Sequence, residues 1–105
     1  MSKQITNLLA KAQEKGQAIV NGRMNMGWGM VGNLEEKYAI EIEGSKLVMR
    51  HWGTQTIEID LIKNEIVSYY GESVSDRDSL NTLIHLLGIE GKFRYFPSKD
   101  LFILE

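Results

Sequence analysis

The chain has 105 residues, 12 basic and 14 acidic, with a formal net charge of −2. This length accommodates one domain around one hydrophobic core. It contains no cysteine, which excludes disulfides, thiolate metal sites and cysteine nucleophiles and favours a reducing cytoplasm as its location. Its basic residues form no cluster, so a nucleic-acid partner is not expected. A membrane span is not expected either, since no apolar run approaches the roughly 18 residues that one needs.

The N-terminal third predicts a helix followed by strands. Apolar residues spaced i, i+3, i+4 and i+7 indicate a helix over residues 2–15, which Gly16 ends. A short strand over 18–20 is predicted to turn at Asn21-Gly22, because this dipeptide suits a type I′ turn. A second strand is predicted over 23–31.

The rest of the chain predicts strands, one helix and a closing hairpin. We expect the helix from about Asp76 to Leu87, with Ser75 as its N-cap and Gly88 at its end. Alternating apolar residues predict strands over 37–43, 46–52, 54–61 and 66–70, and a hairpin over 92–96 and 101–104. The pattern predicts a single α+β domain with a curved antiparallel sheet of about five to seven strands and two packed helices.

The segment 24–30 alternates large apolar residues with small or polar ones. Its soft, adaptable side chains are typical of surfaces that grip another protein, and its glycines let the segment adjust. The same alternation is also typical of a hairpin face packed into the core. Gly27–Gly32 fits the pattern G-x-G-x-x-G, but strand alternation rather than a helix follows, so no dinucleotide site is expected. The predicted partner-binding residues are Met24, Met26, Trp28, Met30 and Trp52.

The start of the second helix gathers polar and aromatic side chains that could hold a small ligand. Its backbone N–H groups and an arginine could take a phosphate, with a tyrosine or Trp52 stacking on a base. The simpler interpretation is that the acids satisfy the helix N-terminus and that the arginine pairs with one of them. The ligand-binding residues of this alternative are Tyr70, Ser75, Asp76, Arg77 and Asp78.

The two histidines offer the only route to acid–base chemistry. Neither His51 nor His85 has a clear partner in the sequence, so an enzyme is the lowest-ranked class, and no cofactor or metal site is expected. His51 next to Trp52 could stack on a nucleotide or simply close a sheet edge. A histidine paired with Asp76 or Asp78 at a pocket would argue against a protein without catalytic groups.

Residues 46–90 carry a resemblance. His51-Trp52-Gly53-Thr54, followed by the stretch from Tyr70-Gly71-Glu72 to Ser79-Leu80-Asn81, resembles small uncharacterised proteins of phages and prophages of Gram-positive bacteria. Some phage proteins of this size and acidity act as anti-CRISPRs or other anti-defence inhibitors, and this context is all that the resemblance implies about function.

These observations predict a non-enzymatic phage-type binding protein that occludes a host or phage protein, as an anti-CRISPR or similar inhibitor would. The alternative is a protein that binds or sequesters a nucleotide at the helix start. Short edge strands also invite pairing with a second copy, so a homodimer is expected.

Overall fold

The computed structural model describes residues 2–105, apart from the side chain of Asn25. Two α-helices, seven β-strands and a short 3₁₀ helix make up the described chain. In chain order they are α1 (Lys3–Lys15), β1 (Gln17–Gly27), β2 (Met30–Glu43), β3 (Lys46–His51), β4 (Thr54–Asp60), β5 (Glu65–Tyr69), α2 (Val74–Leu86), β6 (Phe93–Phe96), η1 (Pro97–Lys99) and β7 (Leu101–Leu104).

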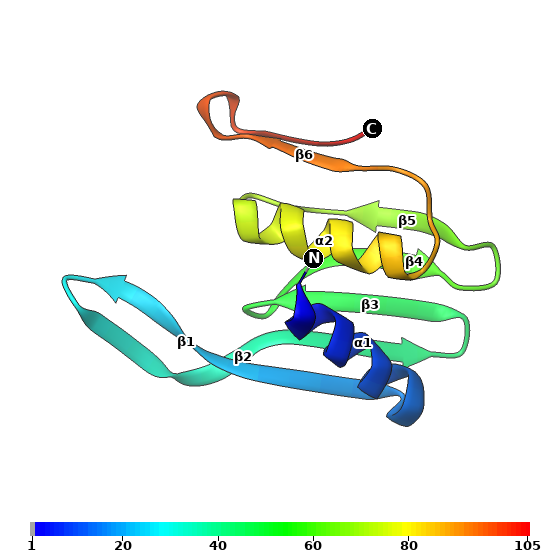
Figure 1. Cartoon of the computed structure of the whole chain (residues 1–105), viewed down its shortest axis with the longest axis horizontal. Coiled ribbons are helices and arrows are strands. Elements are labelled where there is room, and N and C mark those ends of the chain that lie inside the picture. Colours follow the sequence, from blue (N-terminus) through cyan, green and yellow to red (C-terminus); the bar gives the residue numbers. More distant parts are fainter. Residues whose placement is uncertain (1) are drawn as a thin grey trace.

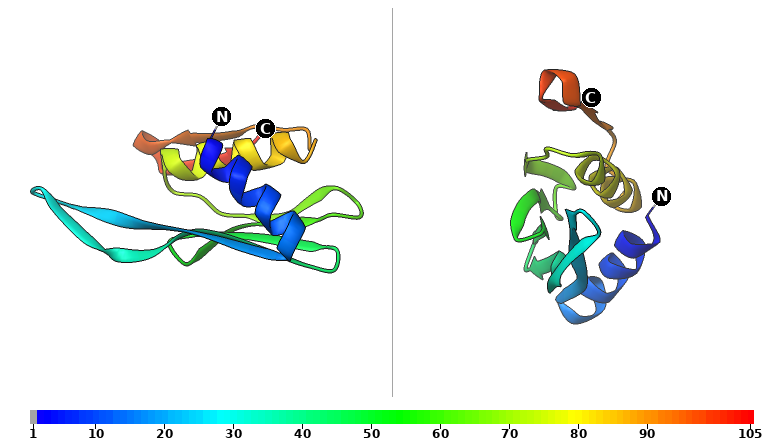
Figure 2. Two further views of the ribbon diagram at one scale, coloured as in Figure 1. Left: turned by 60° about the horizontal axis from the view of Figure 1, so that its bottom comes forward. Right: turned by 90° about the vertical axis from the view of Figure 1, so that its left-hand side faces the viewer.

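The fold is α+β, as the sequence predicts. Strands β1 to β5 form one antiparallel sheet in the order of the chain, and β6 and β7 form a separate hairpin. Both helices cover the same face of the large sheet, and the β6–β7 hairpin lies beyond β5 and α2 (Figures 1 and 2). No helix in the described part of the chain is long and apolar enough to cross a membrane.

The core lies between the helices and the sheet. Helix α1 contributes Ile5, Leu8, Leu9 and Ala12, all of which are buried, on the predicted apolar stripe. Inward-facing residues of β2, β3 and β4 meet them, with Ile40, Leu47, Met49, Ile57 and Ile59 fully buried. Thr56, a polar residue of β4, is also buried, and its hydroxyl donates to the Met49 carbonyl at 3.3 Å.

The first hairpin turns later than the sequence predicts. Strand β1 continues through Asn21-Gly22, where the register shifts, and the turn lies at Trp28-Gly29. This pairing places Val20 opposite Tyr38, next to the core. A turn at Asn21-Gly22 would instead have paired residues 17–20 with the methionine segment. The prediction failed because Asn-Gly also suits a bulge, and long-range pairing decided between the two.

The consequence is a long two-stranded arm, which we define as residues 21–36. Strand β3 pairs with β2 only from Tyr38 to Glu43, so the arm extends past the edge of the five-stranded sheet (Figure 1). At its base, Arg50 on β3 donates to Glu41 at 2.9 Å and to Glu36 at 3.4 Å. These ion pairs hold β2 at the point where the arm leaves the sheet.

Helix α2 begins two residues earlier than predicted. Its N-cap is Ser73, not Ser75, and the Ser73 hydroxyl accepts a hydrogen bond from the Asp76 N–H at 3.1 Å. Asp76 therefore occupies the third helical position. Gly88 follows the helix with a φ of 70°, which agrees with the predicted end.

Candidate functional site

One end of the sheet collects most of the residues that the sequence singled out. Because the sheet is an antiparallel meander, the β1–β2 turn, the β3–β4 turn and the connection from β5 to α2 all lie at that end. Figure 1 shows the arm, the β3–β4 turn and the start of α2 on the same side of the molecule. Residues up to fifty positions apart in the chain thus become neighbours.

Both turns at this end are built on a Trp-Gly pair. Trp28 and Gly29 have φ values of 52° and 73°, and Trp52 and Gly53 have values of 51° and 82°. Each pair connects directly paired residues, as a two-residue hairpin with positive φ at both central positions requires. Glycine adopts this conformation freely, whereas tryptophan does so at a cost of about 1–3 kcal/mol.

The arm exposes the predicted partner-binding residues. Trp28 is fully exposed, and the exposed fractions of Met24, Met26 and Met30 are 44%, 63% and 62%. The core interpretation of segment 24–30 is therefore wrong. Trp52, the fifth predicted residue, is partly buried and lies 6.0 Å from the His51 ring, measured between ring centroids.

His51 has a partner that the sequence did not reveal. Its Nδ1 lies 2.7 Å from Asp76 Oδ1, and only 9% and 7% of the two side chains are exposed. The expectation that neither histidine has a partner was wrong for His51, because β3 ends where α2 begins. The Tyr38 ring, opposite His51 on β2, stacks on the imidazole at 4.3 Å and 7°.

Asp76 is a carboxylate held in its ionised form. Burial alone would raise its pKa, but hydrogen bonds from His51 and from the Glu72 N–H outweigh burial and lower the pKa below the ordinary value. The Glu72 N–H donates to Oδ2 at 3.0 Å, so both carboxylate oxygens have a donor. The same burial that fixes this pair raises the pKa of the Tyr38 hydroxyl.

The other helix-start residues are divided between two surfaces. Tyr70 and Ser75 lie on the same side as His51, and the Tyr70 hydroxyl donates to the Glu72 carboxylate at 2.9 Å. Arg77 forms an ion pair with Asp78 at 2.9 Å and lines a separate cavity of about 340 Å³ beside β6. The predicted set of five ligand-binding residues is therefore not assembled at one place.

A cavity of about 520 Å³ opens beside the His51–Asp76 pair. The arm, the β3–β4 hairpin and the approach to α2 all contribute to its wall. The lining residues are Met24, Lys37, His51, Trp52, Thr54, Thr56, Tyr70, Glu72, Ser73, Ser75 and Asp76. The sequence carried two separate signals for this site, a histidine before a Trp-Gly turn and the capping sequence Ser73-x-x-Asp76.

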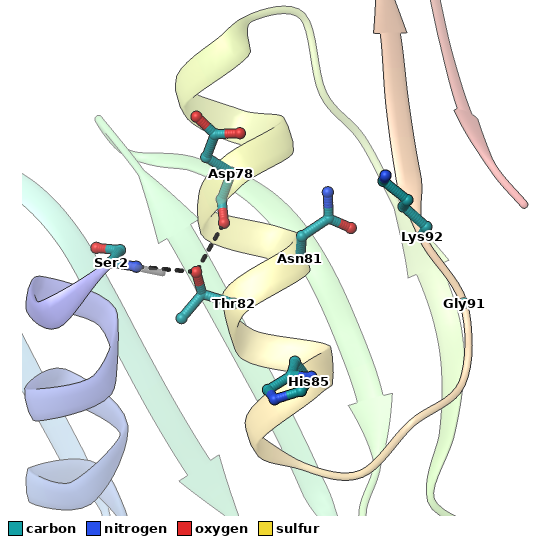
Figure 3. Close-up of a pocket in the computed structure, with 7 residues that line it drawn as sticks. All are labelled: Ser2, Asp78, Asn81, Thr82, His85, Gly91 and Lys92. Carbon is teal, nitrogen blue, oxygen red and sulfur yellow. Dashed lines mark hydrogen bonds between the residues drawn. The ribbon is translucent and has the colours of Figure 1, made fainter.

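His85 lies in a different and larger cavity of about 700 Å³ between α1, α2 and the approach to β6 (Figure 3). Two polar side chains of this wall serve to join elements. Thr82 Oγ1 accepts from the Ser2 N–H at 3.2 Å, and Asn81 both donates to and accepts from the Phe93 backbone, at 3.0 and 2.7 Å. We attribute these groups to folding rather than to a ligand.

The described residues contain no cluster of three or more side chains suited to a metal ion. A scan against protein-family models found no match to the chain, and searches of curated proteins and of solved structures found none either.

Proposed function

We propose that this protein is a binding protein that grips another protein with its arm. The His51–Asp76 pair lies at a cavity, which counts against the expectation of a protein without catalytic groups, so the proposal concerns the arm alone. The partner is a bacterial defence protein, and binding blocks that protein's working surface. The single observation that carries the proposal is the exposure of the methionines and of Trp28 on a hairpin that leaves the sheet.

The arm offers apolar area that folding does not use. Besides the methionines and Trp28, Val31 and Leu34 are 63% and 58% exposed. Large apolar side chains exposed together on one short hairpin are typical of an interaction site. Methionine suits such a site because its unbranched, polarizable side chain adapts to an irregular partner surface.

Trp28 supports the same interpretation through its backbone. A tryptophan with positive φ at the tip of a hairpin loses stability compared with asparagine or glycine, which are favoured there. It gains no burial in return, since its side chain is fully exposed in the isolated chain. A partner that encloses the ring would supply the missing burial, and tryptophan is enriched among residues that dominate binding energy.

The arm can also contribute its backbone. From Met30 to Lys37, no described strand pairs with the edge of β2 that faces β3 further along. Strand β1 is the edge strand of the sheet. Exposed strand edges can pair with a strand of a partner, while the apolar side chains provide selectivity. The resemblance of residues 46–90 to phage proteins supports a defence factor as the partner.

An affinity experiment with a matched control tests the proposal. The tagged chain, a variant with Met26, Trp28 and Met30 replaced by serine, and the control Ile62→Ser would each be exposed to lysate of a Gram-positive host. Ile62 is 84% exposed on the turn at the opposite end of the sheet. We expect the wild type and the control to retain one protein that the arm variant does not retain. Once purified, that protein should bind the wild type and the control but not the arm variant.

Light scattering, which measures the oligomeric state, can contradict the proposal. A wild-type dimer that the arm variant converts to a monomer, with no foreign protein retained, would assign the arm to self-association and contradict the proposal.

A further inference from the structure

The geometry points to a second site, independent of the arm's partner: the cavity beside the His51–Asp76 pair binds a small organic phosphate. His51 and Lys37 would hold the phosphate, and Trp52 and Tyr70 would flank the rest of the molecule. This site replaces the one at Arg77 that the sequence suggested.

The position of the His51 proton follows from its partner. An ionised carboxylate only accepts hydrogen bonds, so the imidazole Nδ1 facing Asp76 carries a proton. The other nitrogen, Nε2, is then a lone pair in the neutral ring and a donor in the protonated ring. Stacking on Tyr38 and the 2.7 Å hydrogen bond fix the ring orientation, as in sites where a carboxylate orients a histidine.

Nε2 of His51 keeps contact with solvent. It has no hydrogen-bond partner among the described residues, and none of their buried side-chain nitrogens and oxygens lacks a partner, so Nε2 is not fully shielded. This holds although nine-tenths of the side chain is buried. Because His51 lines the cavity, we infer that this nitrogen meets solvent at the cavity wall.

Two donors of the cavity wall have no acceptor among the described residues. Both Asp76 oxygens accept a hydrogen bond, and one oxygen of the Glu72 carboxylate accepts from Tyr70, while its other oxygen has no hydrogen bond with a described residue. Lys37 forms no ion pair with a described residue, and its ammonium lies 5.6 Å from the centre of the Tyr38 ring. The Ser73 hydroxyl accepts from the Asp76 N–H and so keeps its own hydrogen to donate.

The Lys37 ammonium and the Ser73 hydroxyl suit a ligand rich in acceptors. A phosphate monoester offers several acceptor oxygens that carry negative charge. The start of α2, whose first N–H groups have no helical acceptor, adds a positive partial charge at Ser75. The volume of about 520 Å³ lies in the range of small-molecule sites, so more than the phosphate can enter.

Histidine side-chain NMR on the full-length protein tests this assignment. The probes are adenosine monophosphate, inorganic phosphate and adenosine, each titrated while the His51 and His85 ring signals are followed. The other titratable groups of this cavity are the carboxylates of Asp76 and Glu72, the Lys37 ammonium and the Tyr70 hydroxyl, and the Tyr38 ring stacks on His51. All of them are retained when the three probes are compared on the wild type.

We expect adenosine monophosphate to shift the His51 ring signals saturably. The variant Lys37→Gln should weaken binding about tenfold, as expected for loss of one charge-assisted hydrogen bond. The control Lys63→Gln, at an exposed turn at the other end of the sheet, should bind as the wild type does. A similar but weaker shift with inorganic phosphate would support a phosphate subsite.

Three results would overturn the assignment. They are adenosine binding as tightly as the monophosphate, shifts confined to His85, and no response of His51 to any probe at millimolar concentration. All three are measured on the protein without its partner, so the outcome does not test the proposed protein partner.

Discussion

Replacing Asp76 by asparagine tests whether the His51–Asp76 pair joins α2 to the sheet. Both side chains are more than nine-tenths buried, and Asp76 accepts from His51 and from the Glu72 N–H. Asparagine keeps the shape and one acceptor oxygen, so about one hydrogen bond to a charged group is lost. We expect the free energy of unfolding to fall by about 1.5–3 kcal/mol at neutral pH.

The direction of the Asp76 pKa shift predicts how the loss of stability changes with pH. The Asp76 pKa is lower in the folded protein than in the unfolded chain, so the aspartate stabilises the fold above its unfolded pKa. That stabilisation is lost as the pH falls through the folded pKa. The difference between wild type and Asp76→Asn should therefore be full at neutral pH and shrink in acid.

Urea unfolding followed by circular dichroism over a pH series measures both effects. The control is Asp78→Asn, which removes an exposed carboxylate paired with Arg77 and should cost less than about 1 kcal/mol. A destabilisation by Asp76→Asn that stays constant from neutral pH to the lowest pH at which both proteins fold would refute the reasoning.

Two further substitutions address the arm tip and the closing hairpin. Trp28→Asn should leave the free energy of unfolding unchanged or raise it by up to about 1 kcal/mol, because asparagine tolerates positive φ better, while partner binding weakens; a clear loss of stability in urea would contradict this. Gly71→Ala should destabilise the protein by about 1–3 kcal/mol, since an added methyl carbon would lie 2.3 Å from the Phe102 ring. Thermal unfolding measures this loss. Gly44→Ala is not a matched control, because Gly44 has a φ of 61°. Adding Phe102→Leu to Gly71→Ala should restore part of the loss, because leucine makes room for the methyl group.

Local patterns predicted most of the fold. The helix stripe at 5, 8, 9 and 12, the helix end at Gly16 and the alternation in β3 each depend on nearby residues, and the structure confirms them. The structure also confirms the closing hairpin, in which Phe93 lies opposite Leu104 and Tyr95 opposite Phe102.

The failures share one physical cause, which is pairing between distant segments. Whether Asn21-Gly22 turns or bulges is decided by β2, some twenty residues away. The His51–Asp76 contact joins residues 25 positions apart and depends on where β3 ends and α2 starts. The exposure of Met24 to Met30 likewise depends on where β3 stops pairing with β2, and no local pattern encodes that point.

Site-specific photo-crosslinking from the arm tip tests the central claim most directly. Benzoylphenylalanine would be incorporated in place of Trp28, or in place of Ile62 as the control, in bacterial cells producing the full chain. We predict one discrete crosslink to a single foreign protein from position 28 and none from position 62. Crosslinks from position 28 only to a second copy of the chain, or no more than from position 62, would contradict the account.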